Sequence, residues 1–202
     1  MNITALIRNR IERIPRGEPF LSATILEIGT RTAVDQTLSR LVKAGVISRL
    51  TRGVFVRPEE NRYVGQVLPE PMKVAESIAR TQGEKIEVHG AEAARRFGLS
   101  TQVPAQVVFM TTGSTSKFRI GKLPVTLKHT NPRRLALAGR PAGVALSALW
   151  YLGKTQVTEA VIETIRTQLP TQEFDALKGA RTSMPTWMAD AFYRYEKRAT
   201  RG

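Results

Sequence analysis

One stretch of the chain, residues 30–58, constrains the fold more than any other. It reads TRTAVDQTLSRLVKAGVISRLTRGVFVRP, a helix-length pattern, then a glycine, then two short β-type runs joined by TRG. A three-residue connection that ends in glycine is typical of a β-hairpin with a bulge. The stretch therefore predicts a helix followed by a hairpin. The apolar face of that helix has the i, i+4, i+7, i+8, i+11 spacing and consists of Val34, Leu38, Leu41, Val42 and Gly45.

Two further helical patterns precede this stretch. A first helix is expected to end near Pro15 and Gly17, and a short second helix to start at Ser22, whose hydroxyl can cap the first turn. Gly29 is expected to end that second helix in a left-handed turn. Three helices followed by a hairpin predict a winged helix-turn-helix over residues 1–60. The apolar stripe of the first helix is expected to be Ile3, Leu6, Ile7, Ile11 and Ile14.

The face of the third helix opposite its apolar stripe is polar and basic. In the major groove of DNA, arginine pairs with guanine, glutamine pairs with adenine, and the methyl groups of alanine and threonine contact thymine. A basic hairpin after such a helix is suited to the DNA backbone. The alternative is a winged helix used only for protein contacts. The predicted DNA-binding residues are Arg31, Thr32, Ala33, Gln36, Thr37, Arg40, Lys43, Arg49 and Arg52.

The charge of the chain favours an anionic partner. Lysine and arginine number 31 against 17 acidic residues, a formal net charge of +14. Such an excess indicates nucleic acid, an anionic membrane surface or an acidic protein. If six DNA phosphates are neutralised, the affinity falls with a salt slope of about −5. One small helix reads few base pairs, so we expect a homodimer on an inverted repeat, as in a promoter.

Two segments together resemble a known family. AVDQTLSRLVKAGVISRLTRGVFVRP and, further along, GAEAARRFGLSTQVPAQVVFMTTG resemble the AbiE-type abortive-infection antitoxins, over most of residues 1–130. That family is a type IV toxin–antitoxin group of phage defence with an N-terminal winged helix. The resemblance implies a transcriptional regulator that represses its own promoter. It also implies a C-terminal part that counteracts a nucleotidyltransferase-like toxin encoded beside it.

The remainder, residues 61–202, predicts a second domain of α+β class. Residues 61–71 have few apolar anchors and two prolines, which is typical of a linker. Short strands then alternate with a helix, and residues 117–129 alternate between apolar and polar as in an antiparallel hairpin. After Pro141 the pattern is helical to the end, as in a helical bundle. The predicted fold class is therefore α+β, with a winged helix, a small antiparallel sheet and a C-terminal helical part.

A long basic segment runs through this second domain. No acidic residue lies between Glu92 and Glu159. Three interpretations remain open: a solubilising face, a docking surface for nucleic acid or for an anionic substrate of the toxin, and a docking surface for an acidic protein. The residues assigned to this basic surface are Arg95, Arg96, Lys117, Arg119, Lys122, Lys128, Arg133 and Arg134.

Enzyme motifs are not found in the sequence. It has no metalloprotease H-E-x-x-H, no phosphate-binding P-loop and no nucleophile elbow, and its carboxylates are too dispersed for a two-metal nuclease. There is no cysteine, and His89 and His129 lie far apart, so neither a metal nor a cofactor is expected. No apolar run is long enough to span a membrane, and we expect a cytoplasmic protein. The alternative function is a winged-helix adaptor or RNA-associated protein without sequence-specific DNA binding.

Overall fold

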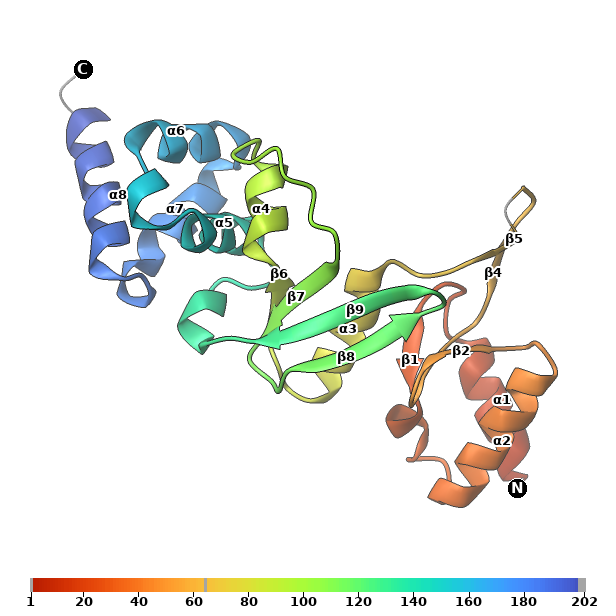
Figure 1. The fold of residues 1–202 in the computed structure, drawn as a ribbon. Helices are drawn as coiled ribbons and strands as arrows, with labels where there is room; N and C mark the ends of the chain where they lie inside the picture. Colours follow the sequence, from red (N-terminus) through yellow and green to blue (C-terminus); the bar gives the residue numbers. More distant parts are fainter. Residues whose placement is uncertain (1, 64, 200–202) are drawn as a thin grey trace. The chain divides into compact units, whose positions relative to one another are not determined.

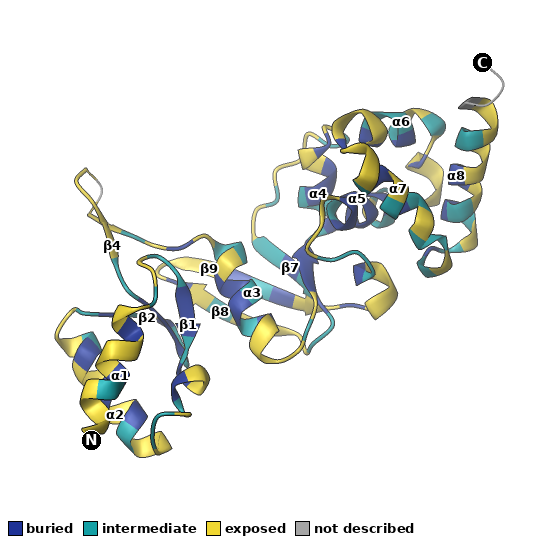
Figure 2. Cartoon of the chain, turned by 180° about the vertical axis from the view of Figure 1, so that it is seen from behind, coloured by how far each residue is buried: buried dark blue, intermediate teal, exposed yellow. Residues whose placement is uncertain are grey.

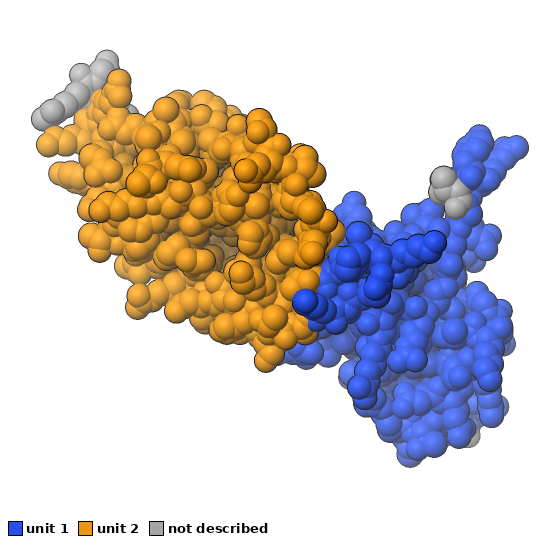
Figure 3. Space-filling view, in the orientation of Figure 1, with its two compact units in different colours: residues 1–83, 117–125 blue, residues 84–116, 126–202 orange. Residues whose placement is uncertain are grey.

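The computed structural model describes residues 2–63 and 65–199 of the chain (Figure 1). Its contacts divide the chain into two compact units (Figure 3). The first unit comprises residues 1–83 and 117–125, and the second comprises residues 84–116 and 126–202. Residues 61–83 therefore group with the N-terminal segment, whereas the domain boundary predicted from the sequence falls after residue 60.

The first unit combines helices with short strands. Most of its elements lie in residues 3–81, and the hairpin residues 117–125 complete it. The elements of residues 3–81 are α1 (Ile3–Glu12), β1 (Pro19–Leu21), the 3₁₀ helix η1 (Ser22–Ile25), α2 (Arg31–Lys43), β2 (Ser48–Thr51), β3 (Val54–Val56), β4 (Glu59–Asn61), β5 (Gly65–Val67) and α3 (Pro71–Thr81).

A three-stranded antiparallel sheet combines β1, which precedes α2, with the two strands that follow α2, in the order β1-β3-β2. The predicted hairpin of β2 and β3 is confirmed, including a register shift between Arg49 and Thr51 and a left-handed Gly53 with φ of 74°. The third strand, β1, was not expected. It pairs with β3 so that Phe20 lies opposite Phe55, and their rings stack with centroids 5.9 Å apart.

The core of the first unit joins α1, η1, α2 and the sheet (Figure 2). In α1 the predicted stripe is confirmed at Ile7 and Ile11, which are buried, but Ile3 is exposed. Each such side chain contributes roughly 1.5–3 kcal/mol when fully buried. The core therefore holds α2 by one face only. Its buried members are Ile7, Ile11, Phe20, Ile25, Val34, Leu38, Leu41, Ile47 and Phe55.

Two expectations about the turn before α2 are wrong. The segment from Ser22 is a single 3₁₀ turn, and no side chain caps it. Gly29 is not left-handed, because its φ is not positive. A β-carbon on Gly29 would lie 2.9 Å from Cγ2 of Ile3, so close packing against α1 explains the glycine better than a left-handed turn.

The predicted linker is also wrong in part. Strands β4 (Glu59–Asn61) and β5 (Gly65–Val67) pair in antiparallel fashion, and Glu59 lies opposite Val67. The side-chain amide of Gln66 donates a hydrogen bond of 2.5 Å to Ser48 Oγ in β2. After it, α3 starts at Pro71 and is followed by Gly83 in the left-handed conformation.

The second unit places helices beside a short sheet. A four-stranded sheet has the order β6-β7-β9-β8, and its strands β6 and β7, which lie in this unit, are antiparallel. Residues 117–125, which hold most of β8 and the start of β9, belong to the first unit. The elements after residue 83 are β6 (Ile86–Val88), α4 (Gly90–Arg96), β7 (Val107–Thr111), β8 (Ser116–Ile120), β9 (Leu123–His129), η2 (Pro132–Leu135), α5 (Pro141–Gln156), α6 (Glu159–Gln168), α7 (Thr171–Gly179), η3 (Ala180–Ser183) and α8 (Thr186–Ala199).

Helix α5 is the centre of the second unit. It is buried almost all round between residues 142 and 149, as its apolar sequence predicts, and α4 packs closely against it. The contact depends on Gly90, since a β-carbon there would lie 2.5 Å from Cβ of Tyr151. In α8, Met188 and Phe192 are fully buried, so its apolar stripe packs inward. Together the two units have the predicted α+β class.

A carboxylate joins α6 to α8 and makes the helical part sensitive to acid. Arg166 donates hydrogen bonds of 2.9 and 3.1 Å to Glu163, and the Tyr195 hydroxyl also donates to it. These bonds lower the pKa of Glu163 to about 2. Because the folded pKa is depressed, the stabilisation is complete above the ordinary value of 4.5 and is lost as the pH falls towards 2.

We therefore expect the Glu163→Gln variant to be less stable than the wild type by a constant amount from pH 5 to pH 8. Below about pH 4.5 the difference is expected to shrink, since Glu163 then takes up a proton in the unfolded wild type while it stays ionised in the folded one. Urea unfolding followed by circular dichroism between pH 3 and pH 8 measures this. The control is Glu60→Gln, an exposed acid in the first unit. A difference that stays constant down to pH 3 would contradict the assignment.

Candidate nucleic-acid interface

Helix α2 has two contrasting faces. Val34, Leu38 and Leu41 are buried at 0–4 % exposure and fix the helix on the core. Thr30 caps its start, because its hydroxyl accepts a hydrogen bond from the Ala33 amide at 3.4 Å. The opposite face remains exposed. Of the predicted DNA-binding residues on the helix, those exposed are Arg31, Thr32, Gln36, Arg40 and Lys43, while Ala33 is half-buried.

Thr37 does not belong to the exposed face, contrary to the prediction. Only 3 % of it is exposed, and its hydroxyl donates a hydrogen bond of 2.8 Å to the carbonyl of Ala33. The reason is its spacing, since Thr37 lies three residues after Val34 and four residues before Leu41, which places it on the inner stripe. The prediction of a thymine contact by Thr37 is therefore wrong.

Ser39 is a member of the outer face that sequence reasoning missed. It is exposed, and it lies three residues after Gln36 and four residues before Lys43. The same i, i+4, i+7, i+8, i+11 spacing that defines the apolar stripe identifies a polar one, which we call the outer stripe. The outer stripe consists of Thr32, Gln36, Ser39, Arg40 and Lys43.

Arg31 stands at the start of α2 and is partly neutralised. Its Nε lies 3.1 Å from Oδ2 of Asp35, and the two side chains are 69 % and 53 % exposed. An ion pair this exposed contributes little stability, so the guanidinium remains able to exchange Asp35 for a phosphate or a base.

The β2–β3 hairpin contributes two exposed cations, Arg49 and Arg52. Arg49 donates a weak hydrogen bond of 3.3 Å to the Thr51 carbonyl, which orients it along its own strand. Arg57, the residue after β3, donates hydrogen bonds to the carbonyls of Glu12 and Ile14 at 2.6 Å each. Arg57 therefore caps the C-terminal end of α1.

The cations of the predicted second basic surface are all exposed, and they are divided between the two units. Lys117, Arg119 and Lys122 lie in the first unit, whereas the other five lie in the second. On β8 and β9 the cations alternate with the buried Ile120 and Leu127, as expected for a hairpin with one polar face.

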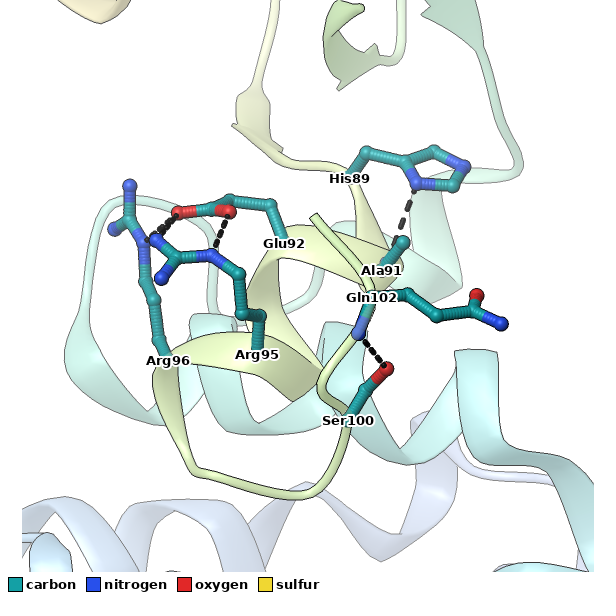
Figure 4. A network of polar contacts seen from close by, with 7 residues as sticks. All are labelled: His89, Ala91, Glu92, Arg95, Arg96, Ser100 and Gln102. Carbon is teal, nitrogen blue, oxygen red and sulfur yellow. Dashed lines mark hydrogen bonds and ion pairs between the residues drawn. The ribbon is translucent and has the colours of Figure 1, made fainter. Parts of the chain in front are cut away.

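Arg95 and Arg96 share a carboxylate on α4 (Figure 4). Both donate to Glu92, through Nε at 2.8 and 3.1 Å respectively. The hydrogen bond from Arg95, with a further one from Arg96, lowers the pKa of Glu92. The carboxylate therefore stays ionised and offsets part of the positive charge of α4.

Neither a metal site nor a membrane-spanning helix is found among the described residues. No group of three or more histidine, cysteine or acidic side chains is placed to hold a metal ion in residues 2–63 and 65–199. Within the same part of the chain, no helix has the length and apolarity needed to cross a membrane.

The fold defines an α+β protein with an exposed basic helix face in its first unit. Residues 6–177, which begin in α1 and end in α7, match the family of unknown function DUF6088. Since the match covers most of the chain and reaches both units, the protein belongs to this family. No curated protein matches the chain.

Proposed function

We propose that the first unit is a winged helix-turn-helix that binds DNA, with α2 as the recognition helix and the β2–β3 hairpin as the wing. The observation that supports this most is the outer stripe of α2. It stays exposed although the opposite stripe of the same helix is buried, and two exposed arginines, Arg49 and Arg52, follow on the next hairpin. Helix and hairpin come in the order that winged helices use.

Some side chains of the proposed interface provide affinity for DNA, and others provide preference for a base sequence. Arg40, Lys43 and the hairpin arginines supply positive charge for phosphates, and the affinity they provide depends on salt. Gln36 has the amide geometry for adenine, and Arg40 can alternatively pair with guanine. One copy of α2 spans few base pairs, so two copies on an inverted repeat in a promoter are required for useful specificity.

The regulatory role follows from the sequence resemblance to the AbiE-type antitoxins. The chain represses its own promoter and counteracts a nucleotidyltransferase-like toxin encoded beside it. Two segments support this role, since the winged-helix sequence and GAEAARRFGLSTQVPAQVVFMTTG occur in the order of that family. In the fold they cover α2 to β3 and α4 to β7.

Co-expression tests the antitoxin role. The neighbouring reading frame is expressed alone and together with this chain, and growth is scored. Growth arrest by the neighbour alone, with rescue by this chain, is the expected result. A neighbour that does not affect growth, or an arrest that this chain leaves unchanged, would contradict the role.

Gln36→Ala is expected to relax base preference and leave non-specific binding almost unchanged. One lost amide contact to a base corresponds to about 1–3 kcal/mol of discrimination, or roughly 5- to 150-fold. Fluorescence anisotropy with the promoter sequence and with scrambled DNA measures the ratio of the two affinities. The control is Gln82→Ala, an exposed glutamine after α3. If the ratio of promoter affinity to scrambled-DNA affinity is the same in the wild type and in Gln36→Ala, either the adaptor function is favoured or another surface of the protein recognises the bases.

A further inference from the structure

The second unit contains a cavity of about 80 Å³ at the junction of α4, β7, η2 and α5. This exceeds the roughly 10–15 Å³ that one water needs, so the cavity is large enough for a group of several atoms. Two of its lining residues, Arg134 and Tyr151, are exposed, which gives solvent a route to it. The lining residues are His89, Gly90, Met110, Thr130, Arg134, Leu135, Ser147, Trp150 and Tyr151.

The lining is rich in hydrogen-bond donors and contains no carboxylate. The Nε1 of Trp150 is buried and has no hydrogen-bond partner among the described residues. A buried donor of this kind is unfavourable unless water or a ligand satisfies it. Thr130 and Ser147, each 7 % exposed, add two hydroxyl groups to the lining.

The imidazole of His89 adds a further donor. Its Nδ1 accepts a hydrogen bond of 3.3 Å from the Ala91 amide, as Figure 4 shows. Nδ1 therefore carries no proton, and the proton of the neutral ring is on Nε2. Burial, and after it the charge of Lys128, lowers the pKa of His89, so the ring is neutral at pH 7.

Positive charge at the cavity comes from Arg134. Its guanidinium carbon lies 4.4 Å from the ring centroid of Trp150, which fixes the side chain against the cavity wall. Lys128 is close enough to act electrostatically on His89. A phosphate group has several acceptor oxygens and a negative charge, which suit this set of donors.

We propose that this cavity binds a phosphate-sized anion, either free inorganic phosphate or the terminal phosphate of a mononucleotide. Arg134 supplies the charge, and the hydroxyls of Thr130 and Ser147 with the indole N–H of Trp150 supply the hydrogen bonds. The site lies wholly in the second unit. It shares no lining residue with α2 or with the β2–β3 hairpin.

Equilibrium dialysis of the full chain with radiolabelled inorganic phosphate at fixed ionic strength tests this site. Saturable binding of about one phosphate per chain is expected, and Arg134→Gln should weaken it at least tenfold. The matched control is Arg133→Gln, which removes an exposed charge from the same turn outside the cavity lining. Ser147→Ala should weaken binding without a change of charge.

Competition by adenosine monophosphate, but not by adenosine, would identify a nucleotide phosphate, whereas competition by phosphate alone would identify the free anion.

Two results would overturn the proposal. One is the absence of saturable phosphate binding by the wild type. The other is an equal loss of binding in Arg133→Gln and Arg134→Gln, which would indicate diffuse attraction by the basic surface. Circular dichroism of each variant shows whether it is folded.

Discussion

A chain carrying Arg40→Glu is expected to bind its promoter about 100-fold more weakly than the wild type, or worse. Arg40 is exposed on the outer stripe, in the last turn of α2, and it forms no ion pair with another described residue. Loss of a base or phosphate contact removes up to about 3 kcal/mol, and the new carboxylate repels the phosphates as well. Fluorescence anisotropy with promoter DNA at two salt concentrations measures the loss.

The matched control for Arg40→Glu is Arg80→Glu. Both arginines are exposed in the last turn of a helix in the first unit, so both changes alter net charge and helix-end electrostatics in the same way. Only Arg40 lies on α2. Equal losses in both variants would show that overall charge, and not the outer stripe, drives the binding.

Leu38→Ala is expected to destabilise the first unit by about 2–5 kcal/mol. Leu38 is 1 % exposed in the core that fixes α2, and truncation leaves a cavity beneath the recognition face. Faster amide hydrogen exchange in residues 31–43 is the expected readout, since it reports on this unit separately. DNA binding should fall in proportion to the folded fraction.

Ser39→Ala is the control for Leu38→Ala, because Ser39 is the next residue and is exposed. Surface changes of this kind usually alter stability by no more than about 0.5 kcal/mol. Unchanged exchange in Leu38→Ala would contradict the packing of α2 by its inner stripe.

The sequence predicts the elements with clear periodicity and not those fixed by tertiary contacts. The apolar period locates α2 between Thr30 and Ala44, and the TRG connection locates the bulged hairpin. Strand β1 has three residues and no alternation to reveal it, because it forms by pairing with β3. Gly29 looks like a helix terminator, but close approach of Ile3 is what requires a small residue there.

The sequence predicts the candidate interface only in part, as it does the fold. Polar residue type alone assigns Thr37 to the outer face, although its spacing from Val34 and Leu41 assigns it to the inner one. The part played by Arg57 depends on α1, which is far away in sequence. The cavity at Trp150 brings together residues from 89 to 151, and no local pattern connects them.

The most direct measurement of sequence-specific binding by α2 is a competition assay. The full chain is bound to a labelled fragment of its own promoter, and unlabelled DNA of the same or of a scrambled sequence is added. A complex that the promoter displaces at least 100-fold more effectively than scrambled DNA, with this preference lost in Gln36→Ala, is the predicted result. Equal displacement of the wild-type complex by both competitors would contradict DNA reading by this helix.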